Sequence, residues 1–317
     1  MIKWALIGAS AWMENYHIPV LQKLREKKIV EIVGIWNRTT KSAERLAKTY
    51  SIPRVYSSID ELLEDSIDCV SIVLNKSIIA EYLRLIADRN IPFLTEKPPA
   101  NSYQQALEIL PKTKKISHIV GFNRRYLNTI EQTRQLLPPN ITGYEYNMWR
   151  DNRSDKRYIF ETGIHALNLA EYLFGPIIQV QIISNRIVAE DITVVNLKLI
   201  HDKCEGIMSF QSHASDSREH CRIYGVEKII EFFLNQPLAI DHEGSLRVHE
   251  NGQWKRLDVP SFEQEDDFFG FQNEYMEMVN ILNNKKTSSS TYENSLSCLR
   301  IAEWTESAKI DDILDII

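Results

Sequence analysis

The sequence predicts an α/β protein with two domains. The first is an N-terminal Rossmann domain with a doubly wound parallel sheet, and the second is a C-terminal α+β domain with a large, mostly antiparallel open sheet. Short apolar runs alternate with helix-length segments over roughly the first 120 residues, and apolar-polar alternation replaces that pattern after residue 176. A chain of 317 residues can bury two cores. We therefore predict one domain over 1–121 and a second over 122–317.

The N-terminal pattern is a regular succession of strands and helices. Strands are predicted at 2–7, 29–36, 68–74, 92–95 and 116–122. Helices are predicted at 20–27, 41–50, 59–64, 78–89 and 103–110. Strands that alternate with helices in this way form a parallel sheet covered on both faces.

The C-terminal pattern begins with helices at 127–137 and 163–174, which end at Pro138-Pro139 and Gly175-Pro176. Strand-like runs follow at 177–183, 192–200, 206–211, 220–224, 229–234 and 246–249. Hairpin-sized breaks separate these runs, which favours antiparallel pairing. Two more helices are predicted, at 272–283 and from residue 293 onward.

Composition excludes several classes of protein. The net charge is −6 with both signs well mixed, so neither nucleic acid nor a membrane surface is expected as a partner. The four cysteines are scattered without metal-ligand spacing, which predicts free thiols in a reducing compartment and no metal site. The apolar run near the N-terminus is shorter than a secretion signal needs, and no run is long enough to span a bilayer. We expect a cytoplasmic protein.

The turn after the first strand is a candidate nucleotide-binding turn. A Rossmann turn uses three glycines, of which only Gly8 is present, while Met13 stands at the third position. Ser10 is small and could donate its hydroxyl to a phosphate. The turn is therefore either a dinucleotide site or an ordinary connection from strand to helix.

The end of the second strand bears on which dinucleotide would bind. An acidic residue at this point usually binds the ribose hydroxyls of NAD, but the sequence here has Asn37-Arg38. An arginine offers a planar set of donors to the 2′-phosphate of NADP. This favours NADP over NAD, the alternative being a helix N-cap at Thr39 or Thr40 beside a solvated arginine.

Two further motifs are candidates for catalysis. Glu96-Lys97-Pro98 follows an apolar strand, and ligands of open parallel sheets bind at such strand ends. Glu161 and His165 are four residues apart at the start of a predicted helix, followed at helical spacing by Asn168 and Tyr172. A carboxylate one turn before a histidine can orient it as a general base. The spacing alone equally fits an exposed helix face with an incidental pair.

Taken together, the Gly8 turn, Glu96-Lys97-Pro98, the segment 121–126 and the segment 161–165 resemble the Gfo/Idh/MocA family of NAD(P)-dependent oxidoreductases, most closely its MviM-like branch. The resemblance covers essentially the whole chain. It implies that Lys97 and His165 are catalytic, that Glu161 is the partner of His165, and that Arg125 lies near the cofactor or substrate. The chain departs from the family where Glu161 replaces an aspartate, where Asn168 replaces another, and at Asn75 and Ile79.

The candidate binding residues follow from these motifs. The cofactor is expected to contact Gly8, Ser10, Ala11, Trp12, Asn37, Arg38, Leu74, Asn75, Glu96, Lys97 and Arg125. The substrate is expected to contact Tyr126, Trp149, Arg150, Arg157 and Asn168. The basic stretch 149–157 either receives an anionic substrate or is a solvated loop.

The leading hypothesis is hydride transfer between NADP(H), or NAD(H), and a hydroxyl or carbonyl carbon of a sugar, polyol or related small molecule. His165 would move the hydroxyl proton, and Lys97 would stabilise charge on the same oxygen. One alternative is a catalytically degenerate nucleotide- or sugar-binding sensor or scaffold. Another is transient oxidation that drives elimination or hydrolysis at a sugar. The resemblance also implies a homodimer or homotetramer formed through the C-terminal sheet.

Overall fold

The computed structural model describes the chain apart from residues 152–156, 190–191, 235–243, 259–268, 285–287 and 317. The chain divides into two compact units. Unit 1 comprises Met1–Phe122 and Phe271–Leu296, and unit 2 comprises Asn123–Gly270 and Ser297–Ile317. The first boundary lies one residue after the predicted one, and unit 1 also takes in a C-terminal segment that we assigned to the second domain.

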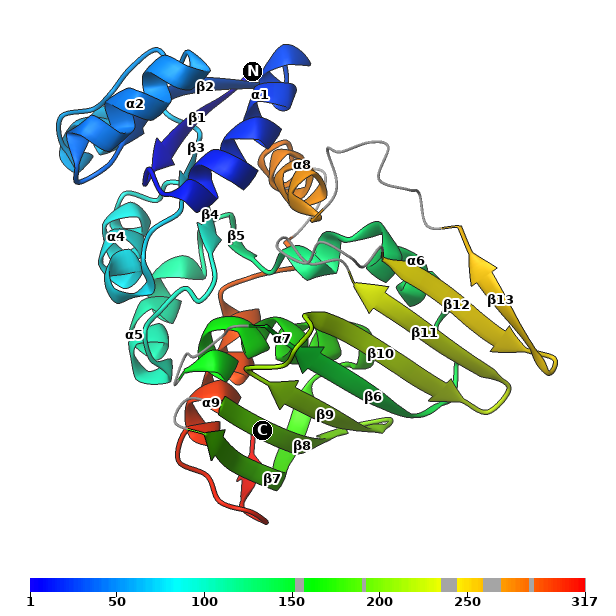
Figure 1. Cartoon of the computed structure of the whole chain (residues 1–317). Coiled ribbons are helices and arrows are strands. Elements are labelled where there is room, and N and C mark those ends of the chain that lie inside the picture. The colour runs from blue at the N-terminus through cyan, green and yellow to red at the C-terminus, as the bar shows by residue number, and fades with distance from the viewer. Residues whose placement is uncertain (152–156, 190–191, 235–243, 259–268, 285–287, 317) are drawn as a thin grey trace. The chain divides into compact units, whose positions relative to one another are not determined.

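Unit 1 is built on a five-stranded parallel sheet in the order β2-β1-β3-β4-β5 (Figure 1). Its strands are β1 (Ile2–Ile7), β2 (Val30–Trp36), β3 (Cys69–Ile72), β4 (Phe93–Glu96) and β5 (His118–Gly121). Its helices are α1 (Ile18–Glu26), α2 (Thr40–Tyr50), α3 (Ile59–Glu64), α4 (Lys76–Asp88), α5 (Tyr103–Thr113) and α8 (Phe271–Leu282). The predicted Rossmann domain is confirmed, and the strand order reverses between β1 and β3, as in doubly wound sheets.

Helix α8 belongs to unit 1 because of what its buried face contacts. Tyr275 is fully buried, and its ring lies 5.2 Å from the ring of Trp4 on β1. In Figure 1, α8 runs beside α1, the helix that follows β1. An apolar helix face must be buried, but its sequence pattern does not specify which sheet covers it. For that reason the pattern predicted the helix and not its domain.

Unit 2 contains a sheet whose nine strands, within the described residues, run in the order β13-β12-β11-β10-β6-β9-β8-β7-β14. The strands are β6 (Ile141–Trp149), β7 (Ile177–Ala189), β8 (Ile192–His201), β9 (Glu205–Gln211), β10 (Arg218–Gly225), β11 (Lys228–Leu234), β12 (Ser245–Glu250), β13 (Gln253–Leu257) and β14 (Ile313–Asp315). All described pairs in this sheet are antiparallel except β6 with β9. The large, mostly antiparallel sheet is thus confirmed, and β6, β13 and β14 were not predicted.

The helices of unit 2 lie against one face of that sheet. They are α6 (Asn128–Leu136), α7 (Ile164–Phe174) and α9 (Leu296–Thr305), with short helical turns η2 (Asn123–Tyr126) and η3 (Ile159–Gly163). Strand β9 alternates between buried residues such as Met208 and Phe210 and outward-facing residues such as Ile207. This alternation is what a sheet with one covered face requires. Among the described helices of the chain, none is long and apolar enough to cross a bilayer.

Candidate active site

The turn after β1 requires a glycine for two reasons. Gly8 has a φ of +108°, a conformation that residues with a side chain rarely adopt. A Cβ atom at this position would also lie 2.2 Å from the carbonyl oxygen of Val73. The Gly8 N–H donates to the Trp36 carbonyl at 2.8 Å, so the turn is closely packed between the ends of β2 and β3.

Side chains hold this turn in place where the usual second and third glycines are missing. Ser10 Oγ accepts a hydrogen bond from the Met13 N–H at 3.2 Å. Asn37 Oδ1 accepts from the Ala9 N–H at 3.2 Å, and Asn37 Nδ2 donates to the Thr39 carbonyl at 3.1 Å. Two predicted cofactor residues, Ser10 and Asn37, therefore also have structural roles. Ser10 thereby binds the first residue of the helical turn η1 (Met13–His17), which leads directly into α1.

A pocket of about 210 Å³ opens beside the Gly8 turn. Its lining comes from the carboxyl ends of three neighbouring strands and from α4: Ala9, Ser10, Trp36, Asn37, Arg38, Thr39, Val73, Leu74, Asn75, Ile78 and Tyr82. Ligands of open α/β sheets bind at this point, where the strand order reverses. Five of the eleven predicted cofactor residues thus lie together: Ser10, Asn37, Arg38, Leu74 and Asn75.

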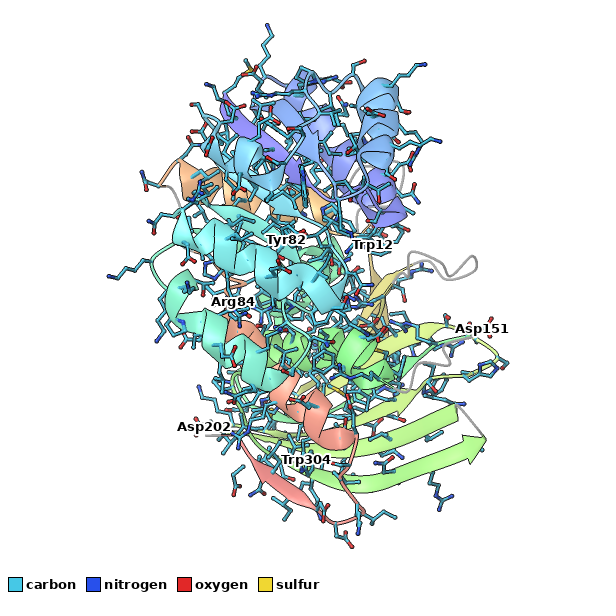
Figure 2. The ribbon with its side chains drawn as sticks, turned by 90° about the vertical axis from the view of Figure 1, so that its left-hand side faces the viewer. Trp12, Tyr82, Arg84, Asp151, Asp202 and Trp304 are labelled. Carbon is cyan, nitrogen blue, oxygen red and sulfur yellow. The ribbon has the colours of Figure 1, made fainter. Side chains whose placement is uncertain are left out.

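The pocket wall carries one unengaged cation. Arg38 is exposed, and within the described residues its side chain makes no hydrogen bond or ion pair. Tyr82 projects from α4 (Figure 2), with its ring 5.2 Å from the ring of Trp36. Burial raises the pKa of Tyr82, and the positive charge of Arg38 partly opposes this rise. The pocket therefore pairs a free guanidinium with aromatic surface.

Glu96, at the end of β4, is a buried carboxylate with several donors. Its Oε1 accepts from Trp12 Nε1 at 2.9 Å and lies 3.0 Å from His17 Nε2, while its Oε2 accepts from the Lys97 N–H at 3.2 Å. Burial by itself would raise the pKa of Glu96, but the hydrogen bond and charge of His17, the charge of Lys97 and the hydrogen bond of Trp12 lower it overall. The structure brings the predicted residues Trp12, Glu96 and Lys97 together.

His17 was not among the predicted site residues. It is a single histidine near the start of a helix, and no sequence spacing connects it to Glu96, which follows 79 residues later. The only signal in the sequence was its place shortly after the Gly8 turn.

In unit 2, two of the residues predicted for the site, His165 and Asn168, are buried. The exposed fraction is 6% for His165 and zero for Asn168. The alternative that these residues form an exposed helix face is therefore wrong, because α7 is apolar enough to be covered on nearly all sides. Arg125 Nε donates to Asn168 Oδ1, and the guanidinium lies 5.0 Å from the centre of the Tyr172 ring. Arg125, Asn168 and Tyr172 thus form one cluster.

The basic stretch 149–157 is partly engaged within the protein. Arg150 is buried and donates to Glu219 at 2.6 Å, and Glu219 also accepts from Arg124 and from the Tyr146 hydroxyl. Burial alone would raise the pKa of Glu219, but the charges of Arg124 and Arg150 and these hydrogen bonds lower it to about 2. Substrate binding by Arg150 would have to share this ion pair.

Of the other charged residues in 149–157, one has partners within the protein and the others are not described. Arg157 donates to Glu306 at 2.7 Å and lies 3.8 Å above the ring of Phe160. Arg153, Asp155 and Lys156 lie outside the described residues. Of the other predicted substrate residues, Tyr126 is buried in η2 and Trp149 is half-buried at the end of β6.

The candidate catalytic residues come from both units. Lys97 belongs to unit 1, whereas Glu161 and His165 belong to unit 2. Glu161 is half-buried in η3, one turn before His165. Their joint action stays a prediction from the sequence. Within the described residues, no cluster of His, Cys, Asp and Glu side chains is arranged to hold a metal.

The parallel sheet, the Gly8 turn and the pocket at the strand ends define a nucleotide-binding protein of the Rossmann class. Residues 2–123 match the model of the Gfo/Idh/MocA family, described as an oxidoreductase family with an NAD-binding Rossmann fold. The match is confined to this N-terminal part of the chain. The resemblance, the oxidoreductase class and the nicotinamide-type cofactor predicted from the sequence are thereby confirmed.

Solved structures resemble the whole chain. The dehydrogenase MviM of Clostridium difficile is 18% identical with a TM-score of 0.82, covering 95% of this chain and 97% of that one. An oxidoreductase of Agrobacterium radiobacter, in complex with NAD⁺, L-tartaric acid and magnesium, is 18% identical with a TM-score of 0.82 and coverages of 99% and 98%. UDP-N-acetylglucosamine 3-dehydrogenase GnnA of Acidithiobacillus ferrooxidans is 16% identical with a TM-score of 0.79 and coverages of 97% each.

At these identities the likeness establishes a shared fold and not a shared substrate. Among curated protein sequences, none matches the chain.

Proposed function

We propose that the protein transfers a hydride between NADP(H) and a hydroxyl or carbonyl carbon of a sugar, polyol or related small molecule. The observation that carries this proposal is the pocket of about 210 Å³ at the ends of β1, β2 and β3, with the unpaired Arg38 in its wall. The relatives of the same fold include dehydrogenases, one of which is named for a nucleotide sugar. The family model that matches residues 2–123 is described as NAD-binding, which supports a nicotinamide cofactor.

The residues of the pocket fit a dinucleotide. Ser10 Oγ accepts from Met13, which leaves its hydroxyl proton available for a phosphate oxygen. The turn lies at the start of a helix, where backbone N–H groups favour anions. Arg38 and Thr39 offer donors to a 2′-phosphate, and none of the described residues that line the pocket is a carboxylate that could receive the ribose hydroxyls. NADP is therefore the preferred cofactor, with NAD as the alternative.

The catalytic roles follow the sequence motifs. When bound, the nicotinamide accepts or donates the hydride. Lys97 would donate a hydrogen bond to the substrate oxygen and stabilise its negative charge. His165 would take the hydroxyl proton on oxidation and return it on reduction, and Glu161 would orient the His165 ring. Arg125, held by Asn168, would present its guanidinium near the substrate.

A titration and a turnover assay test this proposal. Binding of NADPH and NADH is followed by cofactor fluorescence, and oxidation of a panel of sugars and polyols is followed by nucleotide reduction. Lys97→Ala and His165→Ala are each expected to reduce kcat by a factor of about 10² to 10⁴, the usual range for a lost acid-base group. Lys112→Ala, an exposed lysine of α5 paired with Asp88, is the matched control for a lost cation.

The outcomes separate the candidate functions. Failure to bind either nucleotide at millimolar concentration would refute the proposal. Tight binding without turnover would favour the sensor or scaffold. Conversion of a sugar without net accumulation of reduced nucleotide would favour elimination or hydrolysis through transient oxidation.

We also propose that the protein forms a homodimer or homotetramer through the sheet of unit 2. Apolar side chains remain exposed on three of its strands: Ile183 (42%), Ile207 (40%) and Trp254 (42%). These side chains are spread from β13 at one edge of the sheet to β7 near the other, and Ile207 on β9 lies between them. Light scattering after gel filtration measures the mass, and Ile207→Asp is expected to shift it toward the monomer.

A further inference from the structure

A chain of hydrogen bonds crosses the interior of unit 1 and ends at Glu96. Trp4 Nε1 donates to Ser71 Oγ at 2.8 Å, and Ser71 Oγ lies 2.7 Å from the Tyr275 hydroxyl. The Tyr275 hydroxyl lies 2.9 Å from His17 Nδ1, and His17 Nε2 lies 3.0 Å from Glu96 Oε1. The members come from five separate segments of the chain. None of them is more than 7% exposed.

The chemistry of the groups gives this chain a direction. The Trp4 indole can only donate, so Ser71 accepts from it, and the Ser71 hydroxyl proton can then be donated to Tyr275. Tyr275 then donates to His17 Nδ1, which must be unprotonated to accept. The ring proton is left on Nε2, where it is donated to Glu96. This is the arrangement in which every donor along the chain meets an acceptor.

Glu96 connects this chain of hydrogen bonds to two candidate site residues. Glu96 Oε1, which accepts a hydrogen bond from His17 Nε2, also accepts one from Trp12 Nε1, and Glu96 Oε2 accepts one from the Lys97 N–H. The carboxylate therefore ties the indole of Trp12, just after the Gly8 turn, to the backbone of Lys97.

Glu274, a second buried carboxyl group in unit 1, shows how a carboxyl group without such donors behaves. Glu274 on α8 is fully buried, and burial together with the charges of Glu96 and Glu277 holds its pKa well above the ordinary value. A buried carboxylate without donors is strongly disfavoured. His17, Trp12 and Lys97 lower the pKa of Glu96, whereas the two buried oxygens of Glu274 meet no hydrogen-bond donor among the described residues.

We propose that His17, backed by Tyr275, is a positioning residue that acts through Glu96 to set the place of Lys97 and Trp12. The proposal rests on the proposed function, in which Lys97 contacts the substrate oxygen. It also gives a role to α8, because Tyr275, which orients His17, lies on this C-terminal helix of unit 1.

Three variants of the full-length protein test the role of His17. In His17→Gln, the amide nitrogen is as many bonds from Cα as Nε2, so a donor to Glu96 is kept. In His17→Leu the donor is lost, and in Tyr275→Phe only the partner of Nδ1 is lost. His118→Gln is the matched control, because His118 is also buried in unit 1 but binds the Ile116 carbonyl and the Tyr292 N–H.

The expected effects are ordered. His17→Leu should lower kcat on the best substrate of the panel by about 10- to 100-fold, the scale of a misplaced catalytic group. KM should change less than kcat, and the Kd for NADPH should rise by a smaller factor through Trp12. His17→Gln should recover most of the loss, and Tyr275→Phe should lie between the wild type and His17→Leu. His118→Gln should leave kcat and Kd unchanged.

A spectroscopic measurement tests the hydrogen-bond chain independently of catalysis. In protein labelled with ¹⁵N-histidine, two-bond ¹H–¹⁵N spectra distinguish protonated from unprotonated ring nitrogens, and His17 is assigned by its absence in His17→Gln. The expected state is Nε2–H with a bare Nδ1, whose signal shifts in Tyr275→Phe.

The failures are distinguishable. If the wild type binds no nucleotide, the proposed function fails while the spectra still report on the chain. If the wild type binds NADPH and His17→Leu matches it in kcat and Kd, the positioning role is overturned. A neutral His17 ring with its proton on Nδ1 and none on Nε2 would also overturn it, and so would equal losses in His17→Gln and His17→Leu.

Discussion

Arg38 provides the sharpest test of how the cofactor is chosen. The substitution is Arg38→Ala, at an exposed side chain in the pocket wall that has no ion pair within the described residues. Because no internal contact is lost, the fold and the pocket should be unchanged. Any effect on binding therefore reports on the ligand.

The size of the effect follows from the contact that Arg38 is proposed to make. A hydrogen bond to a charged group contributes about 1.5 to 3 kcal/mol. Solvent exposure of Arg38 places the contribution at the lower end, and about 1.4 kcal/mol corresponds to a tenfold change in Kd. The Kd for NADPH should rise about tenfold, whereas the Kd for NADH, which lacks the 2′-phosphate, should change by less than about twofold.

Fluorescence titration with both nucleotides measures the two affinities side by side. Lys48→Ala, an exposed cation further along α2, makes the same change in net charge and should alter neither. Added salt should reduce the difference in the Kd for NADPH between the wild type and Arg38→Ala, because salt screens the attraction between exposed charges. Equal weakening of NADPH and NADH, or no weakening of either, would refute the assignment of Arg38 to the 2′-phosphate.

Two further predictions concern stability and the Gly8 turn. Glu219→Gln should lower the free energy of unfolding by about 3 to 5 kcal/mol in urea denaturation, because it leaves two buried arginines without their carboxylate. The pKa of Glu219 falls from 4.5 to about 2 on folding, so the folded state binds fewer protons between these values. Acidification from about pH 5 to pH 2 should therefore lower the free energy of unfolding by about 3 kcal/mol more in the wild type than in Glu219→Gln. Parallel profiles of unfolding free energy against pH for the two proteins would contradict this. Gly8→Ala should raise the Kd for NADPH at least about tenfold, since strain at a positive φ costs about 1 to 3 kcal/mol and the new Cβ would meet Val73 at 2.2 Å. Gly252→Ala, also at positive φ but with open space around it, should leave the Kd unchanged, and equal effects would show that the close contact is unimportant.

Local patterns in the sequence were sufficient for the succession of elements. Period-two and period-3.6 patterns located the parallel strands, the helices α6, α7 and α8, and most strands of unit 2, because these patterns reflect which side of each element is buried. Strand β13 was not predicted because its residues are almost all exposed, and β14 was not predicted because it is only three residues long. The pocket was also predictable, since the ends of neighbouring parallel strands must meet at one edge of the sheet.

The sequence by itself determined the two folds, the glycine-dependent turn, the place of Arg38 at the end of β2, and the motifs around Lys97 and His165. Only the tertiary structure decided that α8 completes the first unit, that His17 and Tyr275 support Glu96, and that Arg150 pairs with Glu219. The physical reason is the range of the interactions. Periodicity and turn chemistry act over a few residues, whereas a buried polar group takes its partner from whichever segment packs against it, and Tyr275 lies 258 residues from His17.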